Sequence, residues 1–204
     1  MLGLGAIFTL FFVTLGPFKL LGPFAQQTQE LSSTALRAIA VRAFVVGLAA
    51  VIVGGYLGTT LAAKWNVSTP AIEIAAGLIL LLVAARLVMA PYEPPPALPP
   101  LPPSRMAATL RLTFPLVVTP YGVAGLIAVL DLTSDGKTVA TVYALLVVVM
   151  VLNLLAMLFV REIMRGPVLL VLQVLAAVLG VLQFALAIQI IIRGLRDLNI
   201  LSPA

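Results

Sequence analysis

Thr14-Leu-Gly-Pro-Phe-Lys-Leu-Leu-Gly-Pro-Phe24 closes an apolar run that begins near Leu4. This stretch combines glycine-proline pairs with a lysine, Lys19. Because proline removes a backbone donor and clashes with the preceding turn, a helix is expected to kink or break here. Inside a bilayer, the freed backbone groups need partners from protein or from a water-lined cavity. The stretch therefore predicts a binding site at a broken membrane helix, with a cation beside it.

A related stretch, Phe114-Pro-Leu-Val-Val-Thr-Pro-Tyr-Gly-Val-Ala-Gly125, opens the second half of the chain. It aligns with the residues from Phe11 to Gly22, so that Pro17 matches Pro120 and Phe18 matches Tyr121. The match predicts an internal repeat with a broken helix at the start of each half. Chance similarity between two apolar segments is the alternative.

The composition indicates an integral membrane protein. Of 204 residues, 62% are apolar and only 9% are charged, and the mean hydropathy is +1.21. Globular domains are usually about a quarter charged, so this chain has too few charges to cover a water-exposed surface. The lipid bilayer is therefore the expected surrounding. The net charge of +5 comes from residues scattered at segment ends, which is typical of headgroup contacts rather than of nucleic-acid binding.

The residue inventory predicts no enzyme. There is no cysteine and no histidine, which excludes thiolate nucleophiles, imidazole bases and Cys/His metal sites. No paired acidic site and no glycine-rich phosphate loop occurs in the sequence. We therefore expect no catalytic residue, no metal and no cofactor.

The apolar runs predict an all-α polytopic fold with six transmembrane helices. The expected spans are residues 4–24, 40–63, 71–89, 107–130, 138–160 and 167–192. Residues 91–104 are more than half proline and predict an extended linker. This linker divides the chain into two three-helix repeats, residues 1–90 and 105–204. Because three helices cross a membrane an odd number of times, the repeats are expected to be inverted, with helices 1 and 4 broken.

The distribution of lysine and arginine predicts the orientation in the cytoplasmic (inner) membrane. The residues expected on one side are Arg37, Arg42, Arg105, Arg161 and Arg165. Those expected on the other side are Lys64, Lys137, Arg193 and Arg196. The small excess on the first side favours both termini outside.

The two broken motifs supply the candidate substrate-lining residues. These are Thr14, Gly16, Pro17, Lys19, Thr119, Pro120, Tyr121 and Gly122. The prolines would expose backbone groups, the hydroxyls would supply donors and acceptors, and Lys19 would contact a substrate carboxylate. Alternatively, Lys19 extends to the membrane interface and the threonines bond to their own helices.

Three further polar residues are secondary candidates: Arg86, Gln189 and Asn153. Arg86 and Gln189 occupy matching places in the third helix of each half, as do Gly77 and Gly180. Arg86 lies near a helix end and could instead extend to the interface. Asn153 could instead form a hydrogen bond between helices.

These motifs resemble the MarC family of bacterial and archaeal membrane proteins, which is also classed as six-helix neutral amino acid transporters. Gly16-Pro-Phe-Lys-Leu-Leu-Gly-Pro-Phe-Ala-Gln-Gln-Thr28 is similar to the family's first-helix motif, and Phe114 to Gly125 to its fourth-helix Pro-Gly motif. Ala71-Ile-Glu-Ile-Ala-Ala-Gly-Leu-Ile-Leu-Leu81 looks like its third-helix signature. Ala187-Ile-Gln-Ile-Ile-Ile-Arg-Gly194 resembles its last-helix ending.

The resemblance implies six helices in the cytoplasmic membrane and transport of small neutral amino acids. The chain departs from the family pattern where Gly16 replaces the usual Asp or Asn, Lys19 the usual Gly, and Leu20 the usual Asn. We therefore expect a secondary transporter or exporter of small neutral solutes, whose two halves rock about a shared site. The alternatives are a non-transporting scaffold or regulatory subunit and, with few polar residues in its favour, an ion channel. A homo-oligomer is left open.

Overall fold

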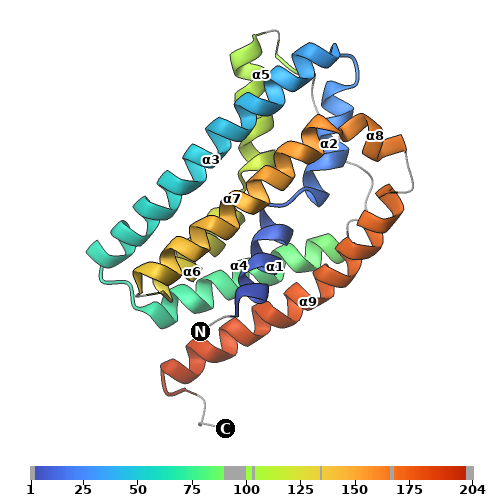
Figure 1. The fold of residues 1–204 in the computed structure, drawn as a ribbon. Coiled ribbons are helices and arrows are strands. Elements are labelled where there is room, and N and C mark those ends of the chain that lie inside the picture. Colours follow the sequence, from blue (N-terminus) through green and yellow to red (C-terminus); the bar gives the residue numbers. More distant parts are fainter. Residues whose placement is uncertain (1–2, 90–99, 103, 134, 166–167, 201–204) are drawn as a thin grey trace.

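The computed structural model describes residues 3–89, 100–102, 104–133, 135–165 and 168–200. All regular structure in these ranges is helical (Figure 1). The elements are α1 Leu4–Thr14, α2 Phe18–Thr28, α3 Ser33–Lys64, α4 Thr69–Met89, α5 Arg105–Leu112, the π-helical turn η2 Thr113–Val117, α6 Pro120–Asp131, α7 Gly136–Leu158, α8 Val160–Arg165 and α9 Val168–Asp197. Most of the predicted proline linker lies outside the described residues.

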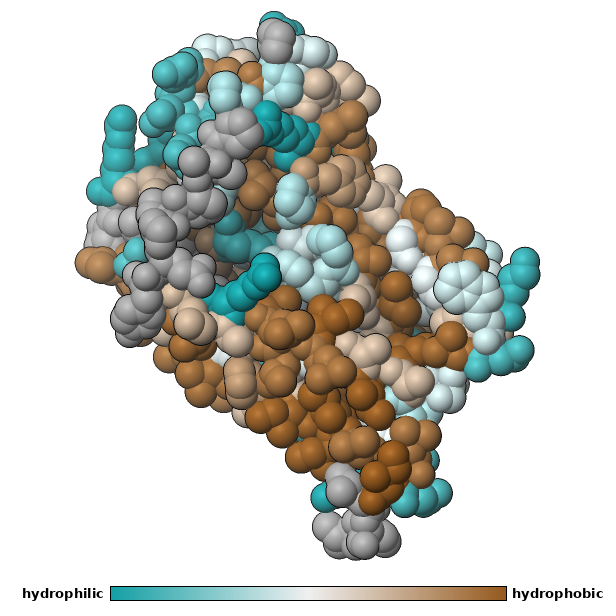
Figure 2. All heavy atoms as spheres, turned by 180° about the vertical axis from the view of Figure 1, so that it is seen from behind, coloured by the Kyte–Doolittle hydropathy of each residue, from teal (hydrophilic) through white to brown (hydrophobic). Residues whose placement is uncertain are grey.

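Five helical segments are long and apolar enough to cross a membrane, and a bent pair makes up to six. The segments are Leu4–Thr28, Ser33–Lys64, Thr69–Arg86, Gly136–Leu158 and Gln173–Asp197. The pair, Arg105–Val117 and Pro120–Asp131, is bent by 56°. An all-helical chain with five or six candidate spans is thus confirmed. Apolar side chains cover a broad area of the face shown in Figure 2, and hydrophilic ones gather at the upper left, the right edge and the bottom, with a few at mid-height on the left.

Two helix boundaries differ from the predicted spans. α3 begins at Ser33 rather than near Ala40, because the Ser32 hydroxyl accepts a hydrogen bond from Ala35 N at 3.2 Å and caps the helix. The last helix continues past Ile192 to Asp197. In both places polar residues extend a membrane helix beyond its apolar run, which a hydropathy criterion alone does not register.

Glycines bring neighbouring helices close together. α4 and α9 lie side by side (Figure 1), with Gly77 against Ala187 and Gly194 against Pro70. A Cβ atom at Gly77 would lie 3.0 Å from the Ala187 carbonyl oxygen, so no larger residue fits this antiparallel contact. Small residues are the usual means of such packing in membranes.

α1 lies inside the bundle and contacts α6, α7 and α9. Its Phe11 and the following Leu15 are fully buried together with Leu126 of α6 and Met150 of α7. The N-terminal apolar run is therefore part of the core, which places its Gly-Pro interruption beside α6 and α7.

Candidate functional site

The first Gly-Pro motif interrupts the helix between α1 and α2. α1 ends at Thr14 and α2 begins at Phe18, while Pro23 lies within α2. A Cβ atom at Gly16 would lie 1.9 Å from the Phe12 carbonyl oxygen, so only glycine allows the chain to turn back against α1. The Phe11 carbonyl accepts from Leu15 N at 2.7 Å, and the break leaves the carbonyls after it without the donors that a continuing helix would supply.

The second motif interrupts the helix between α5 and α6. Phe114, at φ −116° and ψ 120°, leaves the helical region, and Val118 and Thr119 are extended. α6 then begins at Pro120, with Thr119 as its N-cap: the Thr119 hydroxyl accepts a hydrogen bond from Gly122 N at 3.1 Å. A threonine cap followed by proline is a favourable start for a helix.

The two interruptions meet through side chains. Thr119 Oγ1 donates to the Thr14 carbonyl oxygen at 3.0 Å and accepts from Lys19 Nζ at 3.0 Å. Lys19 Nζ also donates to the Thr14 carbonyl. The next carbonyl, that of Leu15, accepts from Asn153 Nδ2 of α7. Side chains of α2, α7 and the N-cap of α6 thus satisfy two of the carbonyls at the first break, those of Thr14 and Leu15.

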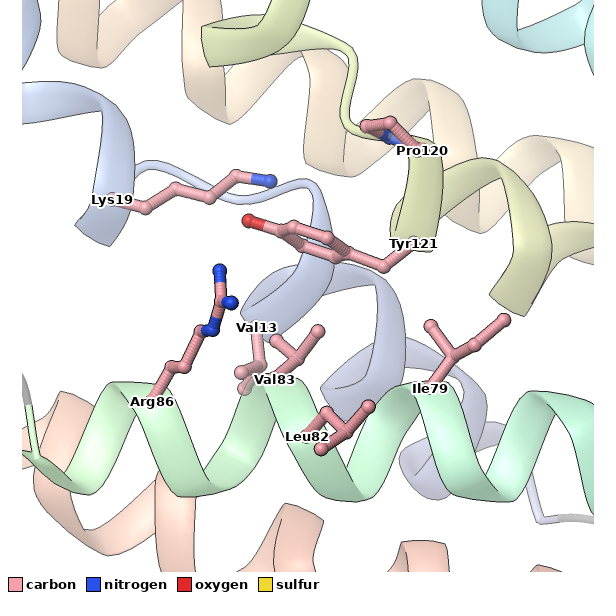
Figure 3. Close-up of a pocket in the computed structure, with 8 residues that line it drawn as sticks. All are labelled: Val13, Lys19, Ile79, Leu82, Val83, Arg86, Pro120 and Tyr121. Atoms are coloured by element: carbon pink, nitrogen blue, oxygen red, sulfur yellow. The ribbon is translucent and has the colours of Figure 1, made fainter.

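A pocket of about 560 Å³ lies beside this junction, between α1, α2, α4 and α6. Its polar lining consists of Lys19, Arg86 and Tyr121, whose charged and hydroxyl groups point toward one another (Figure 3). The remaining lining is apolar and consists of Val13, Ile79, Leu82, Val83 and Pro120. The volume and the few convergent polar groups are typical of small-molecule sites.

The pocket carries positive charge without a carboxylate in its lining. Lys19 Nζ lies 4.7 Å from the centre of the Tyr121 ring, a cation–π distance, in addition to its hydrogen bonds. Arg86 is exposed and forms no hydrogen bond or ion pair within the described part of the chain. The nearest acidic residue along α4, Glu73, pairs with Arg193 of α9 at 3.2 Å. Arg86 is therefore free to bind an anionic group.

The structure places the predicted residues in two layers. Lys19, Pro120, Tyr121 and the secondary candidate Arg86 line the pocket. The other residues predicted from the two motifs are buried behind it: Thr14, Gly16, Pro17, Thr119 and Gly122.

The buried layer supports the pocket instead of lining it. The Thr14 hydroxyl donates to the Leu10 carbonyl of its own helix at 2.6 Å, as the alternative interpretation expected. A Cβ atom at Gly122 would lie 2.3 Å from Leu15 Cδ2, so this glycine lets the start of α6 pack on the first break.

Two secondary candidates lie away from the pocket. Gln189 is exposed and lines a different cavity near Arg193, so its matching position in the repeat does not bring it close to Arg86. Asn153 is fully buried and holds the Leu15 carbonyl, as a hydrogen bond between helices. The sequence-based prediction did not include the pocket wall formed by Ile79, Leu82 and Val83. Their three- and four-residue spacing, continued by Arg86, puts all of them on one face of α4 and could have revealed it.

The helical spans, the broken motifs and the pocket with its basic lining define a multi-pass α-helical membrane protein with a candidate solute site. The chain belongs to the MarC family of integral membrane proteins, whose family model matches residues 3–199. No curated protein and no solved structure matches the chain.

Proposed function

We propose that this protein is a secondary transporter or exporter of small neutral solutes, with small amino acids as the first candidates. The observation that carries the proposal is the pocket of about 560 Å³ at the junction of two interrupted helices. Interrupted helices at a shared cavity are the usual substrate site of secondary transporters. A non-transporting scaffold would instead have a solid interior at this point.

The pocket chemistry fits a small organic solute. Lys19, Arg86 and the Tyr121 hydroxyl can bind a carboxylate, and Val13 and Leu82 offer apolar surface to a short aliphatic side chain. The lining contains no carboxylate, and among the described residues no cluster of three or more His, Cys, Asp or Glu side chains could hold a metal ion. Recognition would therefore depend on a carboxylate and on size.

Alternating access would require the walls of this pocket to separate. One wall is the face of α4 that carries Ile79 and Arg86; the opposite wall is formed by the residues after the two breaks, Lys19 and Tyr121. We propose that residues 1–90 and 105–204 are inverted repeats, that α1–α2 and α5–α6 are broken spans, and that both termini lie outside the cytoplasmic membrane. The hydrogen bonds among Thr14, Lys19 and Thr119 would keep the two breaks together while α4 moves.

Counterflow in proteoliposomes tests the proposal. Vesicles containing the purified protein and loaded with alanine, glycine or serine should accumulate the labelled solute from outside, whereas protein-free vesicles should not. Arg86→Gln should lower the initial rate about tenfold or more, because a charge-assisted hydrogen bond is removed. Arg37→Gln, an exposed cation on α3 away from the pocket, should leave the rate unchanged. Absence of counterflow for all three solutes would contradict transport of small amino acids.

A further inference from the structure

We propose that a second pocket, formed between α2 and α8 at one end of the helix bundle, binds the phosphate headgroup of an anionic phospholipid. This pocket has a volume of about 710 Å³ and shares no lining residue with the solute pocket. The proposal goes beyond transport and does not depend on it, because it concerns a lipid bound at the edge of the bilayer.

The first observation is the position of the pocket. The candidate span Leu4–Thr28 ends with α2, and the span Gly136–Leu158 ends two residues before the start of α8. The short helix α8 then lies beside α2 (Figure 1). Because two apolar spans end at this pocket, it lies where the hydrocarbon core gives way to the lipid headgroups.

The second observation is the charge of the lining. Arg161 and Arg165 enter the pocket from α8, and no carboxylate lines it. Arg165 is exposed and forms no hydrogen bond or ion pair within the described residues. Glu30 and Glu162, the acidic residues closest in sequence, are exposed and lie outside the lining. The Arg165 guanidinium is therefore available to bind the oxygens of a phosphate group.

The third observation is that the other arginine is held in place by the protein. The Arg161 guanidinium donates to the Leu31 carbonyl oxygen and, at 3.3 Å, to the Ser33 hydroxyl. An arginine has five N–H donors, so these two bonds leave other donors for a ligand. A side chain that is already ordered loses little conformational freedom when an anion binds, which favours binding.

The remaining lining suits the rest of a lipid headgroup. Gln26 and Gln29 of α2 supply exposed amides, which can donate to phosphate or glycerol oxygens. Val160 and Met164 supply apolar surface beside the arginines, on which the first methylene groups of an acyl chain can pack. A soluble anion would gain nothing from this apolar surface. The combination of basic, amide and apolar groups therefore favours a lipid such as phosphatidylglycerol.

Thermal unfolding of the full-length protein in a neutral maltoside detergent tests the proposal. Phosphatidylglycerol is titrated into the micelles at constant total lipid, with phosphatidylcholine as the remainder. A ligand that binds the folded protein raises its unfolding temperature by mass action. We expect the unfolding temperature to rise with the mole fraction of phosphatidylglycerol and to reach a plateau, whereas phosphatidylcholine alone should give no such rise.

Arg165→Gln should raise the half-saturating mole fraction of phosphatidylglycerol about fivefold, because one basic contact to the headgroup is lost. Since Arg165 has no partner in the described chain, the variant without lipid should unfold at the wild-type temperature. Arg37→Gln is the matched control, because it removes an exposed cation that is predicted on the same side of the membrane but outside the pocket. Equal effects of the two variants, no effect of Arg165→Gln, or equal stabilisation by the two lipids would overturn the proposal.

A second arm distinguishes a lipid from a soluble anion. Glycerol phosphate carries a headgroup phosphate without acyl chains, and its ionic strength is matched with sodium chloride. It should give no saturable stabilisation that Arg165→Gln removes; such stabilisation would identify a soluble-anion site and refute the lipid assignment. Loss of the lipid effect in Arg86→Gln instead of Arg165→Gln would place the lipid in the solute pocket and would equally contradict the proposal.

Discussion

Lys19 Nζ lies 3.0 Å from Thr119 Oγ1, and the two residues belong to helix breaks in opposite halves of the chain. The Thr119 hydroxyl uses all its hydrogen-bonding capacity at this point: it donates to the Thr14 carbonyl and accepts from Lys19 and from Gly122 N. One hydroxyl thus caps α6, binds the end of α1 and orients the cation of the pocket.

Thr119→Val should be strongly destabilising. The substitution removes the N-cap of α6 and the donor to the Thr14 carbonyl, each worth about 1 kcal/mol. The unfolding temperature in detergent measures the effect. Thr60→Val is the control, because its hydroxyl is exposed and bonds only to the Tyr56 carbonyl of its own helix. If both variants unfold at the same temperature, the junction between the breaks contributes nothing to stability.

Gly122→Ala should destabilise the protein by overpacking. The new Cβ atom would lie 2.3 Å from Leu15 Cδ2 and 2.8 Å from Thr119 Oγ1, so the Leu15 side chain or the start of α6 must shift, at a cost of about 1–3 kcal/mol. Gly136→Ala, in the first turn of α7, meets nothing within 4 Å and should be tolerated. Equal unfolding temperatures for these two variants would contradict the close packing of α6 on the first break.

Asn153→Leu should leave the Leu15 carbonyl without its donor. An unsatisfied buried acceptor costs about 1–3 kcal/mol, and the added apolar volume does not replace the hydrogen bond. Asn153→Gln keeps the amide on a longer side chain, so it serves as the comparison in the same unfolding assay. An Asn153→Leu protein as stable as wild type would show that water or another group satisfies this carbonyl.

Lys19→Met should reduce ligand binding and stability together. The ammonium contacts the Thr14 carbonyl, Thr119 Oγ1 and the Tyr121 ring, and methionine replaces only its apolar stem. We expect at least tenfold weaker binding of a small amino acid and a lower unfolding temperature. Arg86→Gln, which removes a cation without internal partners, should affect binding alone. Equal loss of stability in both variants would contradict the distinct roles assigned to the two cations.

The sequence predicted the helical class well, because length and hydropathy alone determine which segments can span a bilayer. It also predicted Lys19 and Tyr121 as lining residues, and both line the pocket, since a cation and a hydroxyl beside Gly-Pro interruptions are conspicuous in apolar runs. It did not distinguish the residues that line the pocket from those buried behind it. Thr14 and Thr119 belong to the buried set, because their hydroxyls bind backbone carbonyls. The Thr14 bond to Leu10 lies within one helix and was the alternative interpretation, whereas the Thr119 bond to Thr14 joins segments 105 residues apart, which spacing does not encode.

The pairing of Gln189 with Arg86 illustrates a second limit. Equivalent places in a repeat need not face the same cavity, and Gln189 lies near Arg193 instead. The apolar wall on α4 was overlooked for a different reason. In a chain this rich in aliphatic residues, side chains that face a ligand look like side chains that face lipid.

The close pairing of α4 with α9 has a consequence for biosynthesis. α4 is made early, yet the Gly77 face of this helix fits against Ala187 of the last helix, and the buried Glu73 finds its counter-charge in Arg193. Until α9 leaves the ribosome, the Glu73 carboxylate therefore lacks its counter-charge, and the Gly77 face of α4 lacks its packing partner. Completion of the last helix therefore supplies both the counter-charge of Glu73 and the packing partner of Gly77.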